Sequence, residues 1–234
     1  MVKRVTSIQA WEGHTNCLNC SIRSSALFAG LTEQDFENIH DPIEQITLKP
    51  GEVLYKVGDT GHHLFTVRSG LIKLVQYLPD GTQRIVRLMR DMDVIGLEML
   101  VGSQYQHEAV VLRITELCRY PKEAVMELSQ SNPVLHKDLM RQWQKVLTDA
   151  DAWLTKLSTG SAKKRMANLL LRLLEKNTNQ CYLFSREDMG SILSITIETT
   201  SRTISEFKRL NLMKEIRPNH FSLDIKGLEA IIAG

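Results

Sequence analysis

The sequence predicts an α+β fold of three successive parts: an N-terminal antiparallel β-roll, a long helix and a C-terminal winged helix-turn-helix. Short β-rich runs alternate with turn pairs between Ile46 and Pro121. Apolar residues then repeat in heptads as far as Leu157. After Ser185, two helical segments with N-terminal caps are followed by a hairpin pattern. These changes of period along one chain are typical of a β domain joined by a helix to a small helical domain.

The composition is that of an ordinary globular protein, with 43% hydrophobic and 24% charged residues. From Gly160 onward there are 12 Lys and Arg against 8 Asp and Glu, and before it 17 against 19. A basic C-terminal part suits a polyanionic partner. No apolar run approaches the ~20 residues that cross a bilayer, and Met1–Ala10 lacks the apolar stretch of a secretory signal. We therefore expect no membrane association and a cytoplasmic protein with reduced cysteines.

The first part contains β-prone runs bounded by pairs that readily adopt positive φ, a pattern that indicates an antiparallel barrel or sandwich. The turn pairs are Pro50-Gly51, Gly58-Asp59, Ser69-Gly70 and Asp80-Gly81. The predicted strands are Gly51–Tyr55, Leu64–Val67, Leu71–Tyr77, Arg84–Met89 and Ala109–Ile114. Before them, residues 1–26 show no period and are interpreted as an irregular arm, followed by a capped helix at Leu31–Phe36.

A long helix is predicted over residues 133–158. From His136 onward its apolar residues alternate at spacings of four and three, which is the a/d seam of a coiled coil and favours a homodimer. The predicted dimer seam consists of Met140, Trp143, Leu147, Ala150, Leu154 and Leu157, with Leu139, Val146 and Trp153 on its flank. The alternative is that the seam packs on its own domain, as apolar helix faces often do.

A polar hinge, Ser158–Ser161, precedes a helix predicted from Ala162 to Glu175. Ser185 is then a natural N-cap, and a second helix begins near Thr196. Between these helices we expect packing contacts from Ile192, Ile197, Ile204 and Phe207. The stretch Glu215–Leu223 resembles a hairpin that turns at Pro218-Asn219, which would make the domain winged.

The outward face of the second helix has the chemistry of base reading. Arg202 can bond both acceptors of a guanine, Glu198 can accept from cytosine, and the Ser201 hydroxyl can adapt to either. Such residues near the start of a helix suit insertion into the major groove. Phosphate contacts are expected from Ser185, Thr196, Thr199, Lys208 and Arg209. The alternative is an ordinary surface helix of mixed charge.

Two sets of residues resemble the CRP/FNR family of bacterial regulators. Gly58–Gly61, Leu64–Val67 and Arg68–Gly70 look like the family's β-roll, a domain similar to cyclic-nucleotide-binding domains. Ile197–Arg202 resembles the recognition helix of the FNR branch, in which the matching Glu, Ser and Arg read bases. The resemblance extends along the chain from about Cys17 onward. It implies a symmetric dimer that binds an inverted repeat of TTGAT-type half-sites, with RNA polymerase as a partner.

The cyclic-nucleotide branch of that family resembles the chain in fold but not in its ligand residues. In that branch a Glu just after a Gly binds the ribose, and an Arg followed by a small polar residue binds the phosphate. Here Glu98 stands one residue further from Gly96, and no Arg stands before Ala109. A slip of one residue turns a side chain to the other face, and Glu108 stands where a phosphate needs a cation. Cyclic AMP is therefore disfavoured as the effector.

The cysteines offer another sensor. Cys17, Cys20 and Cys118 resemble three of the four iron–sulfur ligands of the FNR branch, and thiolates suit such clusters or zinc. The next cysteine of that pattern is missing, so the fourth ligand could be His14 or the Glu12 carboxylate. The alternatives are a redox disulfide or a decayed site, with Cys118 as a buried small hydrophobe.

Other candidates for the sensor are weaker. Cys181 is interpreted as a packed thiol. A haem on His62 or His63, or another small ligand in the β-roll, remains an alternative effector. We expect no enzyme, because nucleophile motifs, phosphate loops and paired carboxylates are missing from the sequence.

The predicted organisation is an arm at 1–26, a β-roll at 27–132, a dimerisation helix at 133–158 and a DNA-binding domain at 159–234. The rival class is a ligand-sensing regulatory module that binds no DNA and uses its C-terminal helices for protein contacts. The basic C-terminal part and the Glu198–Arg202 surface favour DNA binding.

Overall fold

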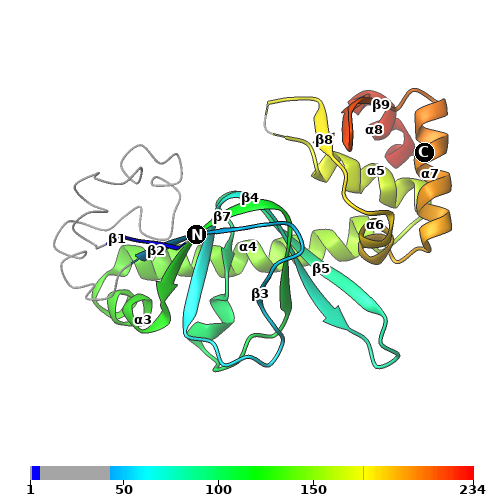
Figure 1. Cartoon of the computed structure of the whole chain (residues 1–234). Helices are drawn as coiled ribbons and strands as arrows, with labels where there is room; N and C mark the ends of the chain where they lie inside the picture. Colours follow the sequence, from blue (N-terminus) through cyan, green and yellow to red (C-terminus); the bar gives the residue numbers. More distant parts are fainter. Residues whose placement is uncertain (1, 6–42, 176) are drawn as a thin grey trace. The chain divides into compact units, whose positions relative to one another are not determined.

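A computed structural model describes residues 2–5, 43–175 and 177–234 (Figure 1). Contacts divide these residues into two compact units. One unit comprises the described residues up to Gln76 together with Arg87–Leu147, and the other comprises Tyr77–Val86 with Thr148–Gly234. None of the helices described is both long enough and apolar enough to cross a bilayer.

The first unit is built on one sheet with the strand order β1-β2-β7-β4-β5, in which β3 also pairs with β7 and β6 with β4. The pairs β1–β2, β2–β7 and β4–β7 are antiparallel, as predicted for the β-roll. The strands are β1 (Val2–Val5), β2 (Ile43–Leu48), β3 (Val53–Tyr55), β4 (His63–Tyr77), β5 (Gln83–Met89), β6 (Val94–Ile95) and β7 (Glu108–Pro121). Residues 2–5 thus form a strand, so the prediction of an irregular arm is wrong there.

The longest strand corrects a second prediction. The pair Ser69-Gly70 does not separate two strands but lies inside β4, where the register against β7 shifts. Gly70 has a φ of 118°, and a Cβ on it would lie 2.3 Å from the Thr115 hydroxyl oxygen. That oxygen accepts from the Leu71 amide at 3.1 Å. The glycine therefore allows a bulge and a close crossing of two strands, and the ladder continues beyond it.

Four further elements of the first unit were not expected from the sequence: strands β2 and β6, the 3-10 helix η1 (Leu97–Leu100) and helix α3 (Lys122–Ser131). The long helix α4 (Pro133–Leu157) agrees closely with its prediction. Its start is set by Asn132, whose side-chain oxygen accepts from the amides of Val134 and Leu135 at 2.9 and 3.1 Å.

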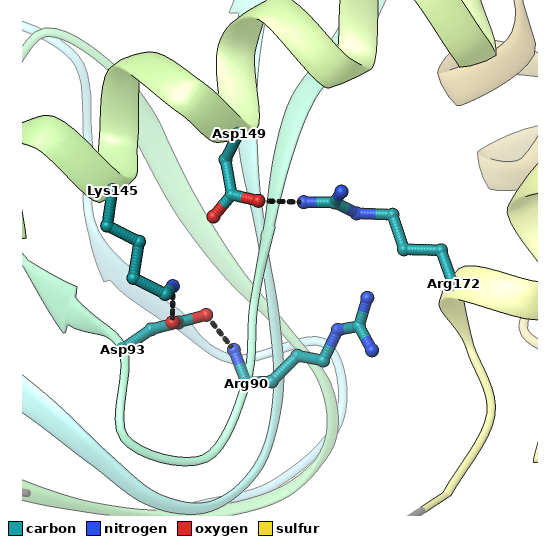
Figure 2. Close-up of polar contacts among 5 residues, drawn as sticks. All are labelled: Arg90, Asp93, Lys145, Asp149 and Arg172. Carbon is teal, nitrogen blue, oxygen red and sulfur yellow. Dashed lines mark hydrogen bonds and ion pairs between the residues drawn. The ribbon is translucent and has the colours of Figure 1, made fainter.

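Within this unit, an ion pair joins α4 to the turn before β6. Lys145 pairs with Asp93, whose other carboxylate oxygen accepts from the Arg90 amide at 2.8 Å (Figure 2). Asp93 is therefore held by its own turn at the point where it meets the helix.

The second unit contains Tyr77–Val86, which includes the start of β5, together with the end of α4 and the small C-terminal domain. Its elements are α5 (Ala162–Arg172), β8 (Gln180–Tyr182), α6 (Arg186–Leu193), α7 (Ile197–Arg209), β9 (Met213–Arg217), β10 (His220–Leu223) and α8 (Ile225–Ala233). The strands form a sheet of order β8-β10-β9. Helix α5 ends before the predicted Glu175, because Leu174 pairs with Cys181 instead. The fully buried Met166, Phe207 and Phe221 bring α5, α7 and the sheet into one core.

Candidate nucleic-acid interface

Helices α6 and α7 form the predicted helix-turn-helix. Ser185 caps α6 by accepting from the Asp188 amide at 3.0 Å, and Thr196 caps α7 by accepting from the Thr199 amide at 3.2 Å. Between them, Ser194 adopts a left-handed conformation with a φ of 57°. Gly190 permits the close turn, since a Cβ on it would lie 2.7 Å from the Ile195 carbonyl oxygen. Local hydrogen bonds and one small residue thus define where α7 begins.

The buried face of α7 differs from its prediction at one position. Ile204 and Phe207 are buried as expected, but Ile197 is 48% exposed and does not join the packing. Thr200 and Thr203 are buried instead, and their hydroxyls donate to the carbonyls of Thr196 and Thr199. Helical side chains lean toward the N-terminus, so Ile197 in the first turn extends beyond the surface that the later residues cover.

The outward face of α7 carries the predicted base-reading residues. Glu198 and Arg202 are exposed one helical turn apart, and Ser201 beside them is half-buried. Hydrogen bonds from its own amide and the Thr196 hydroxyl, with the nearby Arg202 charge, hold the pKa of the Glu198 carboxyl below its usual value. Glu198 is therefore an ionised acceptor at neutral pH, next to a guanidinium donor.

The candidate phosphate contacts divide into engaged and available groups. The Ser185 hydroxyl donates to the Asp188 carboxylate at 2.9 Å, and the hydroxyls of Thr196 and Thr199 lie 3.2 Å apart. Lys208 is paired with Glu215 at 2.9 Å and lies 4.9 Å from the centre of the Phe221 ring. Arg209 is exposed at the end of α7. Of the five predicted phosphate contacts, Arg209 has the side chain best placed to be available.

The ion pair between Lys208 and Glu215 connects two elements, because Lys208 lies on α7 and Glu215 lies on β9 of the wing. The hairpin of β9 and β10 turns at Pro218-Asn219 as predicted, with a φ of 62° at Asn219. The ion pair therefore ties the end of α7 to the wing.

Arg165 on α5 is a structural anchor that the sequence reasoning missed. Its guanidinium donates to the Leu193 carbonyl and, at 3.5 Å, to the Ser194 carbonyl. These groups end α6, where a cation is favoured by the helix dipole and by unsatisfied carbonyls. In the sequence Arg165 is the last of three adjacent basic residues, and nothing distinguishes an inward-facing member of such a run from solvated neighbours.

The exposed stripe on α4 supports most of the predicted dimer seam. Met140, Leu147 and Leu154 are 50%, 65% and 63% exposed, at seven-residue spacing on one helix face. Trp143 and Ala150 between them are half-buried. Leu157 is wrong as a seam residue, because it is 2% exposed and packs within its own chain at the helix end. The flanking Leu139 and Trp153 are also buried.

The interior of the β-roll near η1 is filled by aromatic side chains. The rings of Tyr55 and Tyr105 stack with centroids 3.7 Å apart, and the Tyr105 hydroxyl donates to the His63 carbonyl at 2.8 Å. Leu97 is buried where η1 begins, and the half-buried Glu98 follows it. Burial, with a smaller effect of Glu98, raises the pKa of both tyrosines, that of Tyr105 to about 12.

The residues just before Ala109 carry no positive charge at neutral pH. Burial, with a smaller effect of Arg87, lowers the pKa of His107 to about 4, so the imidazole beside Glu108 is neutral at pH 7. The two side chains just before Ala109 therefore supply a neutral ring and a carboxylate, and the cation that acts on His107 is Arg87 of β5.

Of the four cysteines, the structure describes Cys118 and Cys181. Cys118 is buried on β7, where its register neighbours are Gln45 on β2 and Thr66 on β4. Cys17, Cys20, Glu12 and His14 lie outside the described residues, as does the predicted helix at Leu31–Phe36. Within the described part of the chain, no three His, Cys, Asp or Glu side chains gather as metal ligands would. Cys181 is a packed thiol as predicted, and burial raises its pKa to about 12.

Comparison with known proteins agrees with this geometry. Residues 45–132 match the family model of the cyclic nucleotide-binding domain, and residues 164–231 match that of the Crp-like helix-turn-helix domain. The chain is 30% identical over 235 residues to the transcriptional activator protein FnrA of Stutzerimonas stutzeri, with 95% of each chain covered. It is 24% identical over 206 residues to the anaerobic regulatory protein of Pasteurella multocida, covering 85% of this chain and 76% of the relative.

Among solved structures, FixK2 from Bradyrhizobium japonicum has the same fold, with a TM-score of 0.75 at 21% identity over 82% of this chain and 98% of that one. The α+β fold with its β-roll and helix-turn-helix is thereby confirmed. The relatives are transcription regulators and not enzymes. The chain is a DNA-binding transcription regulator that belongs to the CRP/FNR family, near its FNR branch.

Proposed function

We propose that this regulator binds as a homodimer to an inverted repeat of TTGAT-like half-sites, with one α7 helix in the major groove of each half-site. The observation that carries the proposal is the exposed pair Glu198 and Arg202 on the first two turns of a capped helix. A guanidinium matches the two acceptors of guanine, and a carboxylate accepts from cytosine. Ser201 completes the reading face.

The homodimer is supported by the exposed stripe of Met140, Leu147 and Leu154. A stripe at heptad spacing is complementary to a second copy of itself, since a two-fold axis brings the same residues together. An inverted repeat matches that symmetry because each protomer then meets an equivalent half-site. RNA polymerase is the expected protein partner of the DNA-bound dimer.

The signal is proposed to be redox, oxygen or metal state, received through Cys17, Cys20 and Cys118, with His14 as a further ligand. The support is the Cys-x-x-Cys spacing, the thiolate chemistry of iron–sulfur and zinc sites, and the name of the anaerobic regulatory protein among the relatives. An iron–sulfur cluster held there would supply oxygen-sensitive chemistry. Cyclic AMP is not proposed, because the neutral His107 and Glu108 do not suit its phosphate.

Arg202→Ala tests the reading face. If Arg202 bridges the guanine of each half-site, affinity for the intact operator should fall by ~1–3 kcal/mol per good base contact. Affinity for an operator with both guanines replaced should barely change, because the contact is already lost there. Binding to both DNAs is measured by fluorescence anisotropy at two salt concentrations.

Arg209→Ala is the matched control, an exposed arginine on the same helix. It should weaken both DNAs alike and reduce the salt slope by about one unit, as loss of one phosphate contact does. Equal weakening of both DNAs by Arg202→Ala would make Arg202 a phosphate anchor and refute the proposed reading face.

A further inference from the structure

The Arg172 side chain spans the hinge between the end of α4 and α5. Helix α4 ends at Leu157 and α5 begins at Ala162, with Gly160 between them at a φ of 86°. Arg172, the last residue of α5, donates from Nη2 to Asp149 Oδ1 on α4 at 2.9 Å (Figure 2). The hinge is thus bridged by a contact between residues 23 positions apart.

The same guanidinium also contacts an aromatic ring on α4. Its central carbon lies 5.6 Å from the centroid of the Trp153 ring, within the range of a cation–π interaction. Asp149 and Trp153 are one helical turn apart, so both contacts come from one face of α4. Trp153 is buried, and the side chains of Arg172 and Asp149 are 24% and 37% exposed, so the contact is partly sheltered from water.

The direction of α5 matters for DNA binding because α5 is fastened to the reading helices. Arg165 holds the carbonyls that end α6, and Lys163 pairs with Glu206 on α7 at 2.7 Å. A change in the angle between α4 and α5 would therefore carry α7 with it. In a dimer joined along α4, that angle sets the distance between the two α7 helices.

We propose that Arg172, with Asp149 and Trp153, is a clamp across the hinge that makes the dimer select one spacing between its two half-sites. Arg172 is a positioning residue, since it acts on the distance between the reading helices and not on the bases. The proposal rests on the homodimer and the inverted repeat proposed above. Only an arginine meets both partners at once, because a planar cation can stack on an indole while its edge donates to a carboxylate.

The test compares wild type with Arg172→Met, which keeps the length of the side chain and removes its charge. Each protein is titrated with operators whose central spacer is unchanged or altered by one or two base pairs, and with a DNA that holds one half-site. We expect wild type to prefer one spacer strongly. Arg172→Met should lower that preference about tenfold, because each protomer of the dimer loses a partly exposed ion pair and a cation–π contact, and half-site affinity should stay unchanged.

Arg172→Lys should give an intermediate preference, because it keeps the charge but not the planar edge. Arg141→Met is the control: it breaks the 2.6 Å pair with Asp138, which lies within α4 and does not cross the hinge, and should keep the preference of wild type. If Arg172→Met lowers half-site affinity, the domain itself is damaged, and Asp149→Asn, which leaves the Trp153 contact, takes its place.

An unchanged spacer preference in the variant that keeps half-site affinity would overturn the clamp. The proposed function fails instead if the wild-type protein sediments as a monomer on DNA, or if it binds the full operator and a half-site with equal affinity. The two ideas therefore fail in different measurements.

Discussion

Replacing Leu147 and Leu154 together with aspartate should abolish the dimer. Both leucines lie on the exposed stripe of α4, and no described residue of their own chain covers more than part of them, since they are 65% and 63% exposed. In the proposed dimer each leucine meets its counterpart across the two-fold axis. The double variant therefore changes four side chains of one interface.

The size of the effect follows from the exposed area. Full burial of a leucine contributes about 1.5–3 kcal/mol, so burying the remaining two-thirds contributes roughly 1–2 kcal/mol per side chain. Four leucines then contribute roughly 4–8 kcal/mol, or about three to six powers of ten in the dimer dissociation constant. Four carboxylates facing each other across the seam add desolvation and repulsion to that loss.

Sedimentation velocity across a range of concentrations measures the change directly. The variant should sediment as a monomer where wild type is a dimer, keep its helical circular dichroism, and lose affinity for the full operator. Met126→Asp on α3 is the control, since it places the same charge at another partly exposed apolar residue off the seam. A double variant that stays a dimer at low micromolar concentration would show that the stripe is not the interface.

Two further outcomes test the sensor and the α6–α7 turn. Replacing Cys17, Cys20 or Cys118 with serine should abolish metal uptake and the oxygen dependence of operator affinity. The control Cys181→Ala should preserve both. Unchanged iron or zinc content in all three serine variants would contradict the proposed sensor. Arg165→Met should cost about 1–3 kcal/mol of domain stability, because it strands carbonyls at the end of α6. Thermal denaturation measures that loss, Lys164→Met is its neighbouring control, and equal melting temperatures for the two variants would argue against the anchor.

The predicted fold was most accurate where local signals and tertiary packing agree. The start of α4 at Pro133, both caps of the helix-turn-helix and the hairpin at Asn219 follow from residues that act on their own neighbours. The prediction at Ser69-Gly70 was wrong because a glycine permits a turn and a bulge equally well, and here the residues on both sides of the pair stay paired with β7. Helix α3, which was not predicted, begins after Pro121 without a side-chain cap, so its local signal is weak. Helix α8 was not predicted either, although the Asp224 side chain caps it by accepting from the Gly227 amide.

The candidate site shows a similar division. The exposure of Glu198 and Arg202 could be predicted because helical periodicity places both on one side of α7, and their role in base reading stays a prediction. The predicted seam residues Met140, Leu147 and Leu154 are exposed, as an interface between copies would require, whereas Leu157 is buried in its own chain just before the hinge that leads to α5. Arg165 and Arg172 could not be found in this way, since their partners are 28 and 23 residues distant and their own neighbours are ordinary helix formers.

The hydroxyls at the start of α7 have a role that competes with phosphate binding. The Thr196 side chain accepts from the Thr199 amide, stands 3.2 Å from the Thr199 hydroxyl and helps to lower the pKa of Glu198. If these groups turned to a phosphate, the cap would weaken and Glu198 would lose a partner that holds its carboxylate. A reading residue fixed before binding loses less side-chain entropy when it meets its base. The first turn of α7 is therefore better suited to preparing Glu198 for readout, while phosphate contacts fall to side chains such as Arg209 that have no comparable task.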